Sequence, residues 1–286
     1  MKLAIDSYCY HRYFGEWYPN IQSDPGSRMS IWNFLSRAKE LDVDGVSLES
    51  CFLSWQDDRF VEELSESLQH LQLEPVWAWG HPSGLGSGGR PEELKNLYGN
   101  LDVARRIGAG VMRICGGSRH TRPAHWGQHR DALLELLLPA VEHAEKVGVI
   151  LAIENHVDML ANEMAELIRL VNSPFFGVCL DTANNLRLFE DPVEVAKVLA
   201  PYAKSTHIKD IAAYRGDPRS FSFWPSVPLG EGAVDVSGIL NILKSNNYQG
   251  LLALEIDYLH PKFGSEDSAV EKSISYLRKE ISRHSS

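Results

Sequence analysis

The stretch VILAIENHVDMLANEMAELIRLVNSPFFGVCLD, residues 149–181, decides the fold because it holds one complete unit of a pattern that recurs along the chain. A short apolar run rich in β-forming residues is followed by a longer amphipathic stretch, and a second apolar run then begins. Units of this kind are expected where strands and helices alternate around a parallel sheet.

Eight such units can be counted. We expect their strands at Leu3–Tyr8, Gly45–Leu48, Pro75–Trp79, Gly110–Ile114, Val149–Ile153, Gly177–Leu180, Ala203–Ile208 and Gly250–Leu254. A helix should follow each strand. Eight strands and eight helices predict an α/β fold of the (β/α)8 TIM barrel type, because an open doubly wound sheet more often stops at about five or six strands. A chain of 286 residues fits one such barrel, so we expect a single domain over residues 1–286.

Local signals support several helix boundaries. Ser30, Asp191 and Asp235 each precede a stretch with helical periodicity, where a side-chain oxygen can cap the first turn. Pro192 suits the first helical position because its missing N–H costs no hydrogen bond there. The glycine-rich segment Gly84–Arg90 follows a strand by several residues and lacks the acidic residue of a dinucleotide-binding fingerprint, so we interpret it as a mobile loop.

Composition and charge exclude several classes of protein. With 44% hydrophobic residues the chain can bury a sizeable core. The formal charge of −10 disfavours nucleic acid as a partner, because proteins that neutralise a phosphate backbone present clustered Lys and Arg. No apolar run approaches the ~20 residues of a membrane span, and the N-terminal residues do not resemble a secretory signal. We therefore expect no membrane partner and a cytoplasmic location.

Four cysteines, Cys9, Cys51, Cys115 and Cys179, are widely spaced. They form no C-x-x-C pair, so neither a zinc ribbon nor a thioredoxin-type motif is indicated. We expect them to be small buried residues in a reducing compartment.

Four consecutive predicted strands end in a polar residue: VILAIENH with Glu154, FFGVCLDTANN with Asp181, AKSTHIKD with His207 and GLLALEID with Glu255. The carboxyl ends of the strands form the active site in barrels of this type. Taken singly, each carboxylate could be a helix cap or a salt-bridge partner, and the histidine could be a core residue. Burial of unpaired carboxylates is costly, however, and a shared cation would compensate all three.

Three carboxylates and one imidazole are mostly hard ligands. They leave positions for two further oxygens in octahedral geometry. Mn²⁺ fits this set best, and Mg²⁺, Co²⁺ and Zn²⁺ are alternatives.

The chain resembles the xylose isomerase-like barrel superfamily of sugar phosphate isomerases and epimerases. The resemblance covers essentially the whole chain and rests on ENH at 154–156, LDT at 180–182, HIKD at 207–210, PLGEGAVD at 228–235 and YQGLLALE at 248–255. It implies that the four strand-end residues hold a metal. It further implies that Glu154 and Glu255 shuttle protons at adjacent carbons of a bound sugar, which suits a reaction through an enediolate.

One departure from the family pattern concerns position 184. Many relatives have a histidine three residues after the aspartate of the sixth strand, where this sequence has Asn184. His156, two residues beyond Glu154, is a candidate to take over as a base or as a hydrogen-bond partner of the substrate. Alternatively, it is an ordinary loop histidine.

Polar residues near other strand ends are expected to bind substrate: Glu49, His81, Arg113 and Lys209. Arg113 could hold a hydroxyl, carboxylate or phosphate group, or it could orient Glu154 instead. Lys209 could equally pair with Asp210 or with a neighbouring strand.

Aromatic residues crowd the segments expected at the rim of the site: Tyr8, Tyr10, Trp17, Trp79, Trp126, Phe223 and Trp224. Such rings suit the C–H faces of a sugar, but they could instead cover the end of the barrel or a subunit contact. The long segment from Ile211 to Leu229 is expected to form a lid or an interface loop.

The leading hypothesis is a metal-dependent isomerase or epimerase of a small sugar or sugar acid. The alternative is a lyase or dehydratase acting on a keto-sugar, such as the catalytic subunit of a C-glycoside deglycosidase. Both reactions begin with removal of a proton next to a carbonyl, and they differ in what leaves the enolate.

Two other functions fit the sequence less well. A DNA-repair enzyme of the endonuclease IV branch would need further metal-binding histidines, which this sequence lacks. A barrel kept only as a sugar-binding or partner subunit would not need four intact ligand positions. We expect a sugar or sugar derivative as the ligand and a homo-oligomer, with a hetero-oligomer as the alternative.

Overall fold

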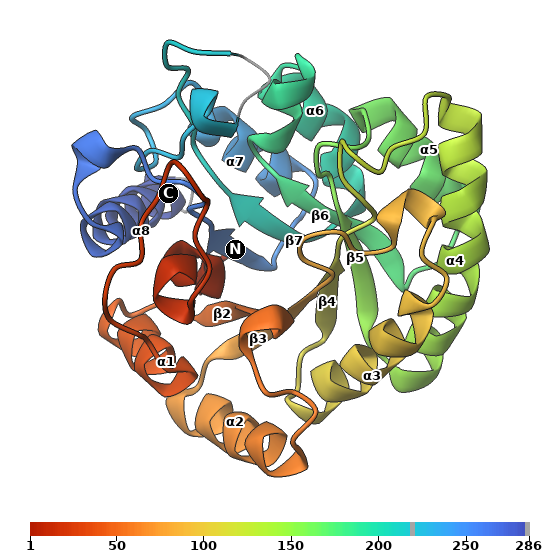
Figure 1. The fold of residues 1–286 in the computed structure, drawn as a ribbon, viewed down its shortest axis with the longest axis horizontal. Helices are drawn as coiled ribbons and strands as arrows, with labels where there is room; N and C mark the ends of the chain where they lie inside the picture. Colours follow the sequence, from red (N-terminus) through yellow and green to blue (C-terminus); the bar gives the residue numbers. More distant parts are fainter. Residues whose placement is uncertain (218–220, 284–286) are drawn as a thin grey trace.

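The computed structural model describes residues 1–217 and 221–283, and its strands form a closed parallel barrel surrounded by helices (Figure 1). The strands follow one another around the barrel in chain order, and β1 pairs with both β2 and β8. They are β1 (Lys2–Asp6), β2 (Gly45–Glu49), β3 (Glu74–Trp79), β4 (Val111–Ile114), β5 (Ile150–Glu154), β6 (Phe176–Asp181), β7 (Ala203–Ile208) and β8 (Leu251–Leu254). The predicted (β/α)8 barrel is confirmed.

An α-helix follows each strand and packs on the outside of the barrel (Figure 1). The helices are α1 (Ile31–Glu40), α2 (Asp58–Leu71), α3 (Glu93–Arg106), α4 (Trp126–Val147), α5 (Ala161–Val171), α6 (Pro192–Leu199), α7 (Val236–Ser245) and α8 (Glu266–Arg283). Ser30, Asp191 and Asp235 each accept a hydrogen bond from a backbone N–H in the first turn of α1, α6 and α7, as predicted. Over the described residues, no helix has both the length and the apolar character needed to cross a membrane.

The first strand is shorter than predicted. The prediction extended it to Tyr8, but β1 ends at Asp6 and the 3-10 helix η1 (Ser7–Phe14) begins immediately after it. The Asp6 carboxylate accepts a hydrogen bond from the N–H of Tyr8 at 2.6 Å, which turns the chain at this point. Asp6 therefore stands at a strand end rather than within a strand.

The glycine-rich segment Gly84–Arg90 is packed against the barrel, which contradicts the interpretation as a mobile loop. Leu85 and Ser87 are buried, and their N–H groups donate to the carbonyls of Cys115 and Gly116. Gly84 has φ +48, and a side chain there would collide with the Cys115 carbonyl. Glycine is thus needed for close backbone approach rather than for flexibility.

Three of the four cysteines are buried, as expected, but Cys51 is exposed. It lies in the short 3-10 helix η2 (Ser50–Phe52) beyond the end of β2. The chain has left the barrel at that point, so the buried apolar strand before Cys51 does not bury the cysteine itself.

The two described parts of the segment expected to be a lid contact each other, because Ile211 pairs with Ser226 in an antiparallel bridge.

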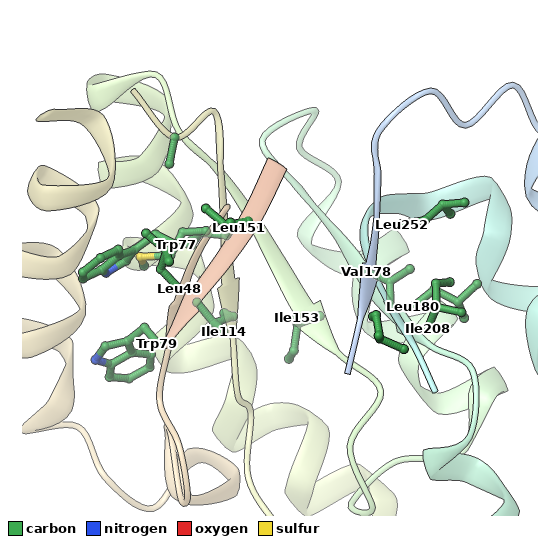
Figure 2. Packing of buried hydrophobic residues seen from close by; sticks show 14 of the residues in the cluster. Leu48, Trp77, Trp79, Ile114, Leu151, Ile153, Val178, Leu180, Ile208 and Leu252 are labelled. Carbon is green, nitrogen blue, oxygen red and sulfur yellow. The ribbon is translucent and has the colours of Figure 1, made fainter. Parts of the chain in front are cut away.

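Strand residues alternate between the helices and the barrel interior. The outward-facing side chains form the main core with the helices, and Figure 2 labels several of them, among them Leu48, Trp77 and Leu180. A separate small cluster of Ala4, Val76, Leu251 and Ala253 lies inside the barrel. It packs the end where the strands begin, and the opposite end is left for polar side chains.

A glycine in β2 tests how tightly the beginning of the barrel is packed. A Cβ at Gly45 would lie 2.5 Å from the Glu74 carbonyl oxygen and 2.7 Å from a methyl carbon of Leu251. Overpacking of this kind costs about 1–3 kcal/mol, so Gly45→Ala should lower the free energy of unfolding by that amount. Gly127→Ala is the matched control, because nothing lies within 4 Å of its added Cβ. Chemical denaturation of both variants checks the prediction, and equal stability of the two would contradict it.

Candidate metal centre and active site

Four polar side chains meet at the carboxyl ends of consecutive strands. Glu154 ends β5, Asp181 ends β6, His207 lies near the end of β7 and Glu255 directly follows β8. One ligand atom of each lies within 4.8 Å of the others, and all four side chains are buried. The structure thus brings together every residue that the sequence predicted as a metal ligand. Asp181 on β6 is paired with His207 on β7, so the register of these two strands places two of the four residues side by side.

The cluster carries more negative than positive charge. In the described part of the chain, Arg113, Arg187, Lys209 and His207 lie among six buried carboxylates in and beneath the site: Asp6, Glu49, Glu154, Asp181, Glu255 and Asp257. Asp181 Oδ2, Glu255 Oε2 and both ring nitrogens of His207 are buried without a hydrogen bond. These atoms have ion-pair contacts, such as that of Lys209 with both carboxylates, but buried polar atoms without aligned hydrogen bonds remain costly. A divalent cation among these atoms would satisfy them and reduce the excess charge.

Lys209 lies beside the cluster rather than pairing with Asp210. Its Nζ lies 3.1 Å from Asp181 Oδ2, 2.7 Å from Glu255 Oε2 and 2.9 Å from Asp257 Oδ2. Asp210 instead accepts hydrogen bonds from three backbone N–H groups in the loop 230–234. Of the alternatives left open by the sequence, the pairing of Lys209 with a neighbouring strand is the one observed.

Arg113 lies inside the barrel between two glutamates. Its guanidinium contacts Glu49 on β2, and Nε lies 3.5 Å from Glu154 Oε2. The Arg113 side chain is 5% exposed, so it can fix the orientation of Glu154 while one edge still lines the cavity. Both alternatives for Arg113 therefore remain compatible with its position.

Two asparagines, Asn155 and Asn184, hold the candidate ligands Glu154 and Asp181 in place through hydrogen bonds. Asn184 donates from Nδ2 to Glu154 Oε1 at 3.0 Å, and its backbone N–H donates to Asp181 Oδ1 at 2.7 Å. Asn155 accepts from the Asp181 N–H and donates to the Asp181 carbonyl. Asn184 thus orients two of the candidate ligands.

The environment shifts the pKa values of these groups in different directions. Burial alone would raise the pKa of Glu154 and Glu255, but Arg113, Lys209 and His207 outweigh it and hold both well below the ordinary range. Burial raises the pKa of Asp181 to about 6 although Lys209 opposes the shift. Burial alone would lower the pKa of His207, but Cys179, Glu255 and Glu154 raise it well above its usual value. In the metal-free protein, His207 therefore carries a proton at neutral pH.

A cavity of about 60 Å³ opens above the cluster. All seven residues predicted to bind substrate or move protons line it: Glu49, His81, Arg113, Glu154, His156, Lys209 and Glu255. His156 Nδ1 lies 3.0 Å from the Gly117 carbonyl, so one ring nitrogen is held by the backbone. His81 Nε2 lies 2.7 Å from Glu16 Oε1.

Sequence reasoning missed several residues of the cavity and its support. Asp6 lies beneath it, with Oδ2 3.4 Å from His207 Nε2, and was overlooked because β1 was extended past it. Asp257 and Arg187 line the cavity and lie 3.4 Å apart. Asp257 follows a strand end, which is a signal that could have found it, whereas nothing in the sequence pointed to Glu16 or Arg187.

The predicted aromatic rim is only partly present. Among the seven rings named from the sequence, Tyr8 lines the cavity, and Tyr18, which was not named, lies beside it with a hydroxyl-to-hydroxyl distance of 2.8 Å. Tyr10 is buried against α8, where its hydroxyl donates to Asp267. Trp126 donates to Glu166 on α5, away from the cavity. These two rings stabilise the outer packing of the barrel instead of the site.

Comparison with known proteins agrees with this geometry. A family model described as "Xylose isomerase-like TIM barrel" matches residues 35–280. The chain belongs to the xylose isomerase-like TIM barrel family. The match covers the four candidate ligands, so the resemblance expected from the sequence is confirmed.

Individual relatives of this xylose isomerase-like barrel are distant. A 3-oxo-isoapionate decarboxylase of Pectobacterium atrosepticum is 25% identical over 162 residues, which cover 57% of this chain and 56% of that protein. This chain thus spans little more than half the length of that relative. An inosose dehydratase of Clostridium beijerinckii is 24% identical over 242 residues, which cover 74% of this chain and 75% of the dehydratase.

Two solved structures resemble this member of the family along nearly its whole length. An L-ribulose 3-epimerase superposes with a TM-score of 0.74 at 15% identity, over 99% of this chain and 95% of the epimerase. The IOLI protein with a bound zinc atom superposes with a TM-score of 0.75 at 15% identity, over 99% of both chains. At such identities the likeness establishes the fold.

Removal of one candidate ligand should weaken metal binding without loss of the fold. His207→Ala removes a ligand atom at the centre of the cluster, and we expect Mn²⁺ affinity to fall at least ~10²-fold. Titration calorimetry with Mn²⁺ measures the affinity, and thermal unfolding checks that the variant is folded. His70→Ala, on the exposed surface of α2, is the control. Unchanged Mn²⁺ affinity in the folded His207 variant would rule out this centre.

Metal binding should also compete with protons. Because the pKa of His207 is raised well above its usual value in the metal-free protein, a cation must displace the proton from the imidazole. We therefore expect affinity for Mn²⁺ to rise between pH 6 and pH 8 and about one proton to be released per cation bound near pH 7. Calorimetry in buffers of different ionisation enthalpy measures the release. Binding without proton release at every pH would contradict the protonation state deduced for His207.

Proposed function

We propose that this protein is a divalent-metal-dependent enzyme that moves a proton at the carbon next to a carbonyl and thereby isomerises or epimerises a small sugar. The observation that carries the proposal is the buried cluster of three carboxylates and one imidazole beneath a polar cavity. Membership of the xylose isomerase-like family supports it, as do relatives that are named as an epimerase and as a dehydratase.

The donor set fits a divalent cation held by Glu154, Asp181, His207 and Glu255. Hard oxygen ligands with one nitrogen suit Mn²⁺ best, and Mg²⁺, Co²⁺ or Zn²⁺ could replace it. The zinc atom bound by the IOLI protein supports a divalent metal in this fold. When bound, such a cation would polarise the substrate carbonyl and stabilise the negative charge that develops on its oxygen.

The two glutamates supply the bases. Glu154 ends β5 and Glu255 directly follows β8, with β6 and β7 between these strands in the barrel order, so the two glutamates reach the cavity from different directions. A low pKa keeps each carboxylate ionised and able to accept a proton. One glutamate can therefore remove a proton from one side of a sugar carbon, while the other is placed to return a proton to the neighbouring carbon or to the opposite side.

The remaining polar residues hold the substrate and the bases in place. Arg113 and Asn184 fix Glu154 from two sides, and Lys209 contacts Glu255. His156 and Glu49 present polar atoms to the cavity, where they can bind sugar hydroxyls. A small, strongly polar cavity of this kind suits a ligand whose surface is mostly hydroxyl and carbonyl oxygen.

A second candidate function is a lyase, in which the same proton removal is followed by loss of a group from the neighbouring carbon. The relatives named as an inosose dehydratase and a 3-oxo-isoapionate decarboxylase favour it.

Hydrogen–deuterium exchange at carbon distinguishes both enzymatic functions from a barrel that binds a sugar without catalysis. In D₂O with Mn²⁺, the protein should incorporate deuterium at carbon in at least one of a panel of ketoses, sugar acids and keto-glycosides.

The glutamates should be indispensable for this exchange even where the metal is retained. Glu154→Gln and Glu255→Gln each keep an oxygen donor but lose the proton acceptor, which should slow the exchange by ~10² to 10⁴. NMR measures deuterium incorporation, and elemental analysis confirms the metal content. Glu63→Gln, on the outer face of α2, is the control. Exchange at the parent rate in both metal-containing variants would move the base elsewhere, with His156 as the first candidate.

A further inference from the structure

A second polar group lines the cavity on the side away from the carboxylate cluster. His81 follows β3, and β3 lies across the closed barrel from β7, which carries His207. His81 Nε2 lies 2.7 Å from Glu16 Oε1, and the Tyr8 hydroxyl donates to the same oxygen at 3.1 Å. Glu16 belongs to the loop after β1, so two loops meet at this pair. The proton transfer between Glu154 and Glu255 uses neither residue.

Four of the other donors in the cavity, Lys209, Arg113, Tyr8 and Tyr18, are poorly suited to give up a proton near neutral pH. Burial would lower the pKa of Lys209 and Arg113, but the carboxylates around them raise it above the usual value. Burial raises the pKa of Tyr8 and Tyr18 well above the ordinary range of a phenol. These four side chains therefore remain protonated and serve as hydrogen-bond donors. An efficient general acid needs a pKa closer to the working pH.

His81 meets that requirement. Burial would lower the pKa of His81, but its hydrogen bond to Glu16 outweighs burial and raises it. Glu255 and Asp257, which face it from beyond β8, act in the same direction. Its side chain is 24% exposed, so the ring can regain a proton from water. The raised pKa favours the protonated ring near neutral pH, and the imidazolium can still transfer its proton.

From this geometry we propose that His81 is a general acid that protonates a hydroxyl leaving the substrate, and that Glu16 is the residue that positions it. The site would then catalyse the dehydration of a keto-polyol. This inference rests on the proposed function, because the same proton removal next to the carbonyl comes first. It extends that function by naming the leaving hydroxyl of the substrate as the group on which His81 acts.

The bond changes balance without a further reactant. A glutamate takes the proton from the carbon next to the carbonyl, and the electron pair of that C–H bond forms the enediolate. The pair then forms a carbon–carbon double bond as the C–O bond on the next carbon breaks. The leaving oxygen takes the proton from His81 Nε2 and departs as water. The glutamate releases its proton to solvent, His81 regains one, and the enol product becomes a ketone.

The substrate class follows from this arrangement. The ligand must carry a carbonyl at the end near the carboxylate cluster and a hydroxyl on the second carbon from it, directed towards β3. Keto-cyclitols and ketoses both meet this condition. An epimerase would not need a proton donor at that distance from the reacting carbon, so His81 separates the two activities.

The test compares two signals from one reaction mixture. Inosose is the probe, with Mn²⁺ in D₂O, and NMR follows deuterium incorporation at carbon together with the unsaturated or deoxygenated product. His81→Gln should lower the rate of dehydration at least ~10²-fold more than it lowers the rate of exchange. Glu16→Gln should keep both reactions at low pH but move the alkaline limit of dehydration to lower pH, because His81 loses the partner that raises its pKa.

An analogue with fluorine in place of the leaving hydroxyl provides the control for a merely structural effect. Fluoride departs with little help from an acid, so the His81→Gln protein should release fluoride at nearly the parent rate. If fluoride release falls as much as dehydration does, His81 acts in binding and not as an acid, and the proposal is overturned.

The remaining outcomes are also decisive. Exchange without dehydration in the parent protein, or dehydration that is unchanged in His81→Gln, overturns the role of His81 and leaves the proposed function standing. No exchange with inosose or with any ketose, sugar acid or keto-glycoside of the panel overturns the proposed function itself.

Discussion

Buried negative charge at the carboxyl end of the barrel is the constraint on which the rest of this site depends. Closure of the parallel sheet carries polar residues from the strand ends into one small volume, where six carboxylates are buried. Charges of this kind are stable away from water only when they are paired. Lys209, Arg113 and Arg187 supply part of the compensation, and the atoms left without hydrogen bonds converge where a divalent cation would complete it.

The same charge arrangement divides the cavity into two functional sides. Around the cluster, basic neighbours hold Glu154 and Glu255 ionised, so neither carboxylate is blocked by a proton of its own. Across the barrel, one carboxylate, Glu16, raises the pKa of His81 and so favours the protonated form that an acid needs. A keto-polyol bound between them would meet a base at the carbon beside its carbonyl and a proton donor at an oxygen further along. Reaction type then depends on how the substrate spans the two sides.

The hydrophobic periodicity of the sequence predicted the barrel, and the polar residues at its strand ends predicted most of the candidate site. Glu154, Asp181, His207 and Glu255 could be predicted because parallel strands bring their carboxyl ends together. Polar residues at those ends therefore meet in one site. The exceptions have physical reasons. Asp6 was hidden because its own hydrogen bond to the Tyr8 N–H ends β1 early. The Gly84 loop was misjudged because close backbone packing and flexibility both use glycine. Glu16 was missed because its partner lies 65 residues away.

Anomalous diffraction at the manganese absorption edge, from crystals of the protein grown with Mn²⁺, tests the central claim most directly. The account predicts one strong peak that is bonded by oxygens of Glu154, Asp181 and Glu255 and by a ring nitrogen of His207, at about 2.0–2.4 Å. A map without a peak among these four side chains, with Lys209 still in contact with Asp181 and Glu255, would contradict it.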